Sequence, residues 1–180
     1  MSVAEDKFSA IFEETASGIK HRGAYYQEDA GEKGMALLEA KFKDTKLYWL
    51  VDLQEDRIFS ARFFAYGGKM SLVIGETLCT MVEGLTVDEA CSLLKTDVEV
   101  RLRDDPEVPS VPESKMKAFD TVDELLKIVK EQYPSAKGVA IASASIDKAD
   151  FQSTAELNLV AQAWMGLTKD EQKEQIEVVL

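Results

Sequence analysis

The sequence predicts an α+β fold: a three-stranded antiparallel sheet with helices packed mainly on one face, followed by a helical C-terminal extension. Two observations lead to this prediction. Three β-rich segments follow one another with only short turns between them, which is typical of an antiparallel meander. Most of the remaining chain carries apolar residues at helical spacing, and several of these stretches begin with capping residues.

The three predicted strands run from Met35 to Lys43, from Lys46 to Gln54 and from Arg57 to Ala65. Short turns at Asp44-Thr45 and Glu55-Asp56 join them. In the middle strand, side chains alternate between the two faces of the sheet. One face receives Leu47, Trp49 and Val51, and the other receives Tyr48, Leu50 and Asp52. Because both faces carry apolar groups, helices are expected to cover at least one of them.

A glycine turn and two helices are predicted after the third strand. Tyr66-Gly67-Gly68 ends that strand, because glycine adopts positive φ at little cost. A helix follows from about Ser71, and Gly84 has the character of the glycine that lies just past a helix end. Thr86-Val87-Asp88-Glu89 is a capping box, so it opens a further helix that is expected to run through Leu94.

The chain before the strands is predicted to hold a helix and a turn. Met1 to Arg22 has an apolar and an acidic face, which indicates an amphipathic helix docked on the core, with Ser2 as its N-cap. His21 is the one histidine of the chain, and it is placed near the C-terminus of this helix, where the dipole favours a cation. Gly23 to Gly34 is polar and glycine-rich, so a turn is expected there.

Beyond the central helices, the sequence predicts a loop and then a helix. Lys95 to Lys115 contains three prolines, which cannot continue a helix, so it is expected to be a loop. Lys115 to Tyr133 has an apolar stripe, and a sequence like a capping box puts the helix start near Asp120. The acidic residues of the loop are expected to be solvated rather than to hold a cation; they are Asp104, Asp105 and Glu107.

The C-terminal part is expected to form a separate, mostly helical extension over residues 134–180, after a first domain over residues 1–133. Pro134 to Ala149 is rich in small apolar residues, and its period leaves open whether it is a strand or a helix. Capping sequences at Ser153-Thr154-Ala155-Glu156 and Thr168-Lys169-Asp170-Glu171 predict two more helices.

Composition restricts the partners and the location of the protein. The chain has 21 Lys and Arg against 33 Asp and Glu, so its formal net charge is −12. This charge repels phosphate backbones and anionic lipid, which disfavours nucleic acid and membranes as partners. There is no run near the roughly 20 apolar residues that a membrane span needs, and the N-terminus is acidic. A cytoplasmic protein is therefore expected.

The sequence offers little material for catalysis or for a resident cofactor. Its two cysteines, Cys79 and Cys91, lie at apolar positions of different predicted helices and are expected to be buried, reduced thiols. A single histidine excludes His-rich metal sites, and the glycine-rich phosphate-binding motifs are absent. We therefore expect no enzyme activity and no cofactor.

Residues 57–90 nevertheless carry a family resemblance. Ala61-Arg62-Phe63, Tyr66-Gly67, Gly84 and Asp88-Glu89-Ala90 appear without a gap in the order and spacing of the central segment of iron-sulfur cluster assembly scaffolds. The chain thus resembles the IscU family, which includes the N-terminal domain of NifU, over Lys33 to Tyr133. The resemblance implies the same α+β fold. It also implies that the N-terminal helix lies at the end where such scaffolds meet the sulfur-donating enzyme.

The resemblance breaks at the residues that hold the cluster. It implies three ligand cysteines, but the corresponding positions here are Phe42, Gly68 and Ala118. A histidine that precedes the third cysteine in the family is matched by Lys117, whereas the aspartate of the family's Cys-Gly-Asp turn is kept as Asp44. Asp44 is therefore the one candidate metal ligand that remains in the family's site.

Two hypotheses of function follow from this pattern. The first is an accessory module related to iron-sulfur cluster assembly, which binds protein partners such as a cysteine desulfurase without holding a cluster. The alternative is a metal or iron-sulfur scaffold with non-standard ligands, drawn from Asp44, Cys79 and Cys91, including across an oligomer.

Overall fold

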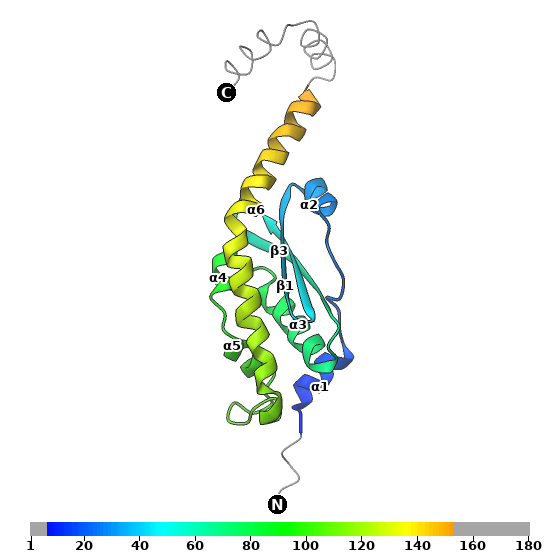
Figure 1. Cartoon of the computed structure of the whole chain (residues 1–180), viewed down its shortest axis with the longest axis vertical. Helices are drawn as coiled ribbons and strands as arrows, with labels where there is room; N and C mark the ends of the chain where they lie inside the picture. Colours follow the sequence, from blue (N-terminus) through cyan, green and yellow to red (C-terminus); the bar gives the residue numbers. More distant parts are fainter. Residues whose placement is uncertain (1–6, 153–180) are drawn as a thin grey trace, which may run out of the picture. The chain divides into compact units, whose positions relative to one another are not determined.

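The structure, a computed structural model, describes residues 7–152 of the 180-residue chain. The two helices predicted from Ser153 and from Thr168 lie outside the described residues. The chain divides into two units, Met1–Ile141 and Ala142–Leu180. The sheet and the core described below belong to the first unit (Figure 1).

The sheet is the predicted antiparallel meander. β1 (Met35–Phe42), β2 (Thr45–Asp52) and β3 (Arg57–Ala65) pair in the order β1-β2-β3, with a bulge between Leu50 and Val51 of β2. The predicted alternation is confirmed, because the two faces of β2 enter different apolar clusters. The main core takes Leu47, Trp49 and Val51, and a smaller cluster takes Tyr48 and Leu50.

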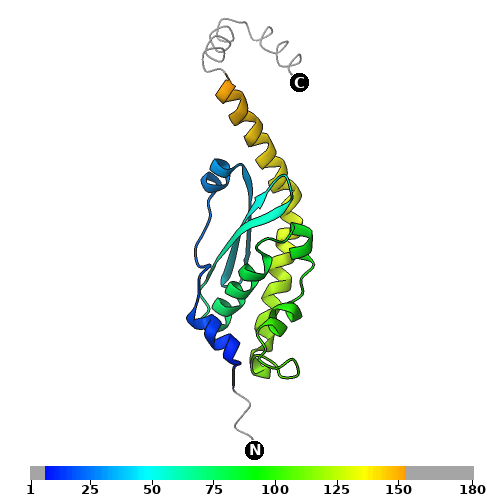
Figure 2. The ribbon, with the colours of Figure 1, turned by 180° about the vertical axis from the view of Figure 1, so that it is seen from behind.

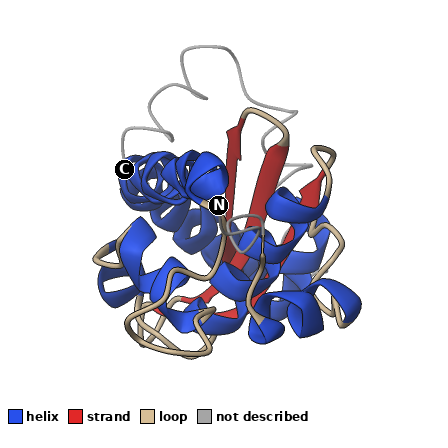
Figure 3. Cartoon of the chain, turned by 90° about the horizontal axis from the view of Figure 1, so that it is seen from below, coloured by secondary structure: helices blue, strands red, loops and turns tan. Residues whose placement is uncertain are grey.

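Most helices pack on the face of the sheet that bears the main core (Figure 3). α3 (Lys69–Val82) lies against β3 and β2, and Figure 2 shows it alongside the strands from behind. The rest of this layer contains α4 (Val87–Cys91), α5 (Lys95–Arg101), the 3-10 helix η2 (Glu113–Phe119) and the first part of α6 (Asp120–Gln152). The largest fully buried side chains of the core include Phe12, Trp49, Phe63, Leu78, Leu102, Phe119 and Leu125. The α+β prediction is therefore confirmed.

The caps predicted in the central segment are present. Glu89 N–H donates to Thr86 Oγ1 at 3.2 Å and Thr86 N–H donates to Glu89 Oε1 at 3.3 Å, which is the reciprocal pair of a capping box. Gly84 follows α3 with φ 85°, as a glycine past a helix end does. α6 begins at Asp120, as predicted.

The N-terminal helix is shorter than predicted. α1 spans Ala10–Ser17, with Ser9 as its N-cap in place of Ser2, which lies outside the described residues. After Gly18, the chain extends along the free edge of β3, where Gly23 N–H donates to Phe63 O at 2.9 Å and Phe63 N–H donates to His21 O at 3.0 Å. Backbone pairing with the sheet thus replaces the last predicted helical turn. The expected docking is confirmed, because Phe12 is fully buried.

Two segments predicted as turn or loop contain short helices. α2 (Gln27–Lys33) lies in the expected turn, and α5 lies in the expected loop. The third residue of each helix is an aspartate that accepts a hydrogen bond from the backbone N–H three residues earlier. Tyr26 N–H donates to Asp29 at 2.7 Å, and Leu94 N–H donates to Asp97 at 2.7 Å. These N-terminal carboxylates stabilise helices whose composition alone favours turns.

α6 continues through Pro134, where the sequence predicted a helix end. The question left open for Pro134 to Ala149 is thereby settled as helix. Side chains on both sides of the proline are bound to the sheet: Tyr133 Oη donates to the Asp56 carboxylate, and Lys137 Nζ donates to it at 2.6 Å. Gln132 also accepts the backbone N–H of Glu39 on β1 at 3.0 Å. These tertiary bonds offset the intrahelical hydrogen bond that proline cannot donate.

The tightest approach of a helix to the sheet occurs at Gly75 of α3. A Cβ atom added at this glycine would lie 2.3 Å from Cδ2 and 2.5 Å from Cε2 of Phe63. Phe63 is 0% exposed, so its ring has no space into which it can turn. Gly138 of α6 is a helical glycine with nothing within 4 Å of an added Cβ, and it provides a matched comparison.

We predict opposite effects of alanine at these two glycines. Gly75→Ala should lower the free energy of unfolding by about 1–3 kcal/mol, because the clash with Phe63 outweighs the gain in helix propensity. Gly138→Ala should raise it by up to about 1 kcal/mol. Urea unfolding of both variants measures the difference. Equal effects at the two positions would contradict the close packing at Gly75.

We also predict that Asp56 stabilises α6 around its proline. Tyr133→Phe removes one donor to Asp56 and should cost about 1 kcal/mol, with faster amide hydrogen exchange over residues 135–141. Lys137 and Tyr133 lower the pKa of Asp56 from its usual 3.8. The contribution of its carboxylate is therefore present above that value and is lost as the pH falls through the lowered pKa. Asp56→Asn should remove this pH dependence, and unchanged exchange in both variants would refute the role.

Candidate functional site

The positions matched to the family's cluster ligands come from three elements. Phe42 is the last residue of β1, Gly68 is the N-cap residue of α3, and Ala118 lies in η2. Phe42 and Ala118 are partly buried and pack against the main core, whereas Gly68 is exposed. A phenyl ring, a hydrogen atom and a methyl group cannot donate an electron pair to iron, so these side chains are inert toward a cluster.

Backbone and side-chain bonds hold the β1–β2 turn to the start of α3. Tyr66 N–H donates to the carbonyl oxygen of Asp44 at 3.0 Å. Ser71 Oγ donates to Asp44 Oδ2 at 2.8 Å, and Thr45 Oγ1 donates to Asp44 Oδ1 at 3.2 Å. Both carboxylate oxygens of Asp44 therefore already accept hydrogen bonds within the turn.

The absence of a side chain at Gly67 allows the Asp44 carboxylate to lie close to the backbone of this turn. An added Cβ at Gly67 would lie 1.4 Å from Asp44 Oδ2, so only glycine leaves room for the carboxylate. The structure thus gives Asp44, the candidate metal ligand of the sequence, a role in closing the turn. Among residues 7–152 there is no group of three or more His, Cys, Asp or Glu side chains arranged to hold a metal ion.

The backbone has positive φ angles, which suit glycine, at the ligand position Gly68 and at Lys43, the residue after the ligand position Phe42. Gly68 has φ 96°, and nothing lies within 4 Å of an added Cβ, so a side chain there would meet open space but a strained backbone. Lys43 has φ 52°, a left-handed conformation that costs a non-glycine residue roughly 1–2 kcal/mol. Its Nζ lies 5.4 Å from the centroid of the Phe42 ring.

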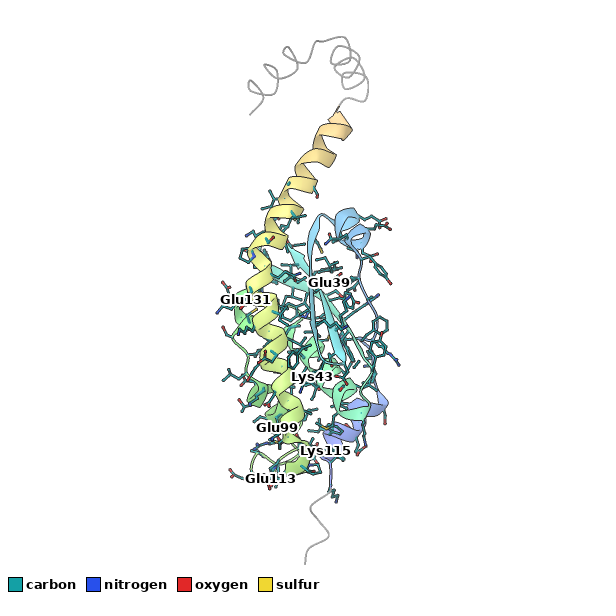
Figure 4. The ribbon with its side chains drawn as sticks, viewed as in Figure 1. Glu39, Lys43, Glu99, Glu113, Lys115 and Glu131 are labelled. Atoms are coloured by element: carbon teal, nitrogen blue, oxygen red, sulfur yellow. The ribbon has the colours of Figure 1, made fainter. Side chains whose placement is uncertain are left out.

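Cationic side chains gather at this end of the sheet, where Figure 4 labels Lys43. The pKa of Asp120, the first residue of α6, is lowered chiefly by its hydrogen bond from Lys95. The charges of Lys43 and Lys117 lower it further, so Lys43, Lys95 and Lys117 all act on one carboxylate. In a chain with a net charge of −12, three lysines thus surround this one carboxylate.

The two thiols are poorly suited to bind metal. Burial raises the pKa of Cys79 well above its usual range, and the carboxylates of Glu76 and Glu83 add to the rise. Burial also raises the pKa of Cys91 to about 11, with a smaller contribution from Asp88. Both cysteines are therefore protonated near neutral pH, whereas the thiolate is the form that binds metals. The predicted buried, unpaired thiols are confirmed for Cys79, and Cys91 is partly buried.

His21 takes part in a cluster of contacts with two carboxylates that the sequence did not predict. Its Nδ1 lies 2.8 Å from Glu76 Oε1, and its Nε2 lies 2.6 Å from Glu83 Oε1. Its backbone N–H donates to Glu76 Oε2 at 2.9 Å. Both ring nitrogens are occupied by carboxylates, so the cluster joins the segment after α1 to α3. Glu76 lies within the apolar stripe of α3, and a buried carboxylate needs a partner. This position was the sequence signal that could have predicted the contact.

The acidic residues of the loop, Asp104, Asp105 and Glu107, are exposed, as expected, and Asp104 also has a structural role. Ala10 N–H donates to Asp104 Oδ2 at 2.7 Å, and Ile11 N–H donates to Asp104 Oδ1 at 3.0 Å. These two bonds lower the pKa of the Asp104 carboxyl. Asp104 therefore caps the free amides at the start of α1 from 94 residues away in sequence.

Within the described part of the chain, no helix combines the length and apolar character that crossing a membrane requires.

Comparison with known proteins assigns the family. A family model described as the NifU-like N terminal domain matches residues 19–140. No curated protein matches the chain. The chain is similar to the crystal structure of a nitrogen-fixing NifU-like protein (N-terminal) from Brucella abortus, with 15% identity and a TM-score of 0.44, over 73% of this chain and 99% of that one. A second crystal structure, of a protein described as hypothetical, has 15% identity and a TM-score of 0.35, over 78% of this chain and 93% of that one.

Both TM-scores lie below 0.5, so the assignment rests on the family model and its extent. Its match covers more than half of the chain, including all three strands and helices α3 to α5. It also contains the resemblance found in the sequence from Lys33 to Tyr133. The chain belongs to the family of NifU-like N-terminal domains.

Proposed function

We propose that this NifU-like domain is a protein-binding accessory module of iron-sulfur cluster assembly, and that it holds no cluster at the positions where its relatives hold one. The family relates the chain to iron-sulfur cluster assembly. The observation that carries the rest is the loss of all three ligand positions, which are Phe42, Gly68 and Ala118. Cluster irons are bound mainly by thiolates, and the three positions supply none.

Other observations disfavour replacement ligands. Both oxygens of Asp44 accept hydrogen bonds in the turn. Cys79 is fully buried, and the raised pKa values of Cys79 and Cys91 keep their thiols protonated. The alternative function, a scaffold using Asp44, Cys79 and Cys91, would need the core to open around Cys79 and the turn to release Asp44.

Anaerobic reconstitution with ferrous iron and sulfide tests the first part of the proposal. The wild-type chain, after desalting, should retain less than about a tenth of an iron per chain and should show no charge-transfer bands in the visible spectrum. Stoichiometric iron would reject the proposal. If Cys79→Ala or Cys91→Ala removed that iron, the alternative scaffold would be established.

A variant with restored ligands provides the positive control. Phe42→Cys, Gly68→Cys and Ala118→Cys together put thiols at the three family positions, and Asp44 is left unchanged. This variant should gain iron and visible absorption under the same conditions, because cluster binding offsets the backbone strain of a cysteine at position 68, where φ is 96°. Thermal melts of both proteins distinguish a failure to fold from a failure to bind.

The expected partner is a cysteine desulfurase, which the domain is expected to bind through α1. The exposed fraction of Ile11 on this helix is 38%, although Phe12 beside it is buried. Ile11→Asp should weaken binding to a purified desulfurase by about tenfold or more, as substitution of an apolar anchor does. Val139→Asp on α6 is the matched control, since Val139 is also exposed, at 59%. Absence of binding by the wild-type chain, or equal losses in both variants, would refute this partner surface.

A further inference from the structure

A cavity of about 500 Å³ lies between α5, η2 and the start of α6. We call it the α5–η2 cavity. Its apolar lining consists of Val100, Met116 and Phe119, and its charged lining includes Lys95, Arg103 and Lys117. Cavities of this volume are typical of sites for small organic ligands.

One wall of the cavity is fixed by a buried ion pair. The Glu99 side chain is 3% exposed, and Arg103 donates to it through Nε at 2.8 Å and Nη2 at 2.7 Å. Ser110 donates to the same carboxylate from its backbone N–H at 2.8 Å and from Oγ at 3.0 Å. Arg103 Nη1 donates to Pro106 O at 2.6 Å. Glu99 and Arg103 are thus fully engaged with each other and with the chain, so they shape the cavity and neither is free to bind a ligand.

A second ion pair joins α5 to α6 beside the cavity. Lys95 Nζ lies 2.6 Å from Asp120 Oδ1, and Lys95 N–H donates to Asp123 Oδ1 at 2.9 Å. These bonds join the first turn of α5 to the first turn of α6. The cavity is therefore preorganised by two sets of contacts, which reduces the entropy lost when a ligand binds.

Lys117 is the cation of this lining that stays unpaired. Lys95 and Arg103 each have a carboxylate partner, whereas Lys117 has no ion pair within 4 Å among the described residues. With the two paired carboxylates Glu99 and Asp120, three cations leave the lining with one net positive charge. The apolar surface beside this ammonium group calls for a ligand that is largely apolar and carries one negative charge.

We propose that the α5–η2 cavity binds a small organic monocarboxylate, with the apolar body of the ligand against Val100, Met116 and Phe119 and its carboxylate on Lys117 Nζ. The lining contains none of the three family ligand positions, although Lys117 is next to Ala118 in the chain. The proposal does not depend on the accessory function argued above.

Titration of the full-length protein with phenylbutyrate, and with its neutral isostere phenylbutyramide, tests this proposal. Binding is followed by NMR through the methyl group of Met116 and the amides of α5. The acid should give saturable shifts, and the amide should bind about tenfold more weakly because it cannot form the charged contact with Lys117. Shifts that do not saturate, or equal affinity for the acid and the amide, would overturn the proposal.

Three variants locate the site. Lys117→Met should abolish the preference for the acid, whereas Lys127→Met, which removes the same charge from an exposed position of α6 outside the cavity lining, should leave it unchanged. Val100→Trp places a bulky ring in the cavity at a residue that is 51% exposed, and it should block both probes without unfolding the protein. Melting curves check that each variant is folded. Wild-type affinity in Lys117→Met or in Val100→Trp would show that the carboxylate binds elsewhere.

Discussion

The packing of α3 on the sheet through Gly75 and Phe63 is the contact on which the rest of this domain depends. It sets the distance between helix and strands, and both ends of the helix are then bound to the sheet. At its start, Ser71 bonds Asp44 in the β1–β2 turn. Past its end, Gly84 N–H donates to Ile58 O at 2.8 Å. A helix anchored at both ends fixes the turns on either side of it, including the one before it that carries Gly68.

This constraint explains how the family's site can lose its ligands and keep its shape. The turn is closed by backbone bonds, by Asp44 and by the missing side chain of Gly67, none of which requires a thiol. Lys43 even keeps a left-handed conformation that would cost glycine nothing. Since these contacts do not involve the side chains at the three ligand positions, the residues at those positions can change without loss of the fold.

The features predicted correctly from the sequence are those that local chemistry determines. Strand alternation, the Thr86 capping box and the start of α6 at Asp120 each depend on residues that are close in sequence. The features that were missed depend on distant partners. α6 continues past Pro134 because Tyr133 forms a hydrogen bond with Asp56, 77 residues away. His21 lies outside the helix predicted for it and contacts Glu76, 55 residues away. Contacts between residues so far apart cannot be predicted from local sequence. Pro134 was therefore predicted to end a helix, and His21 was predicted to lie near a helix C-terminus.

The lysines near the family's ligand positions are opposite in sign to the net charge of the chain. Strong net negative charge on a small domain disfavours close contact with other acidic surfaces, yet Lys43, Lys95 and Lys117 gather around Asp120. In η2, consecutive residues face different surroundings: Ala118 meets the core, and Lys117 meets the α5–η2 cavity. The short helix η2 therefore contributes to both the core and the cavity, and its Met116 and Phe119 belong to both.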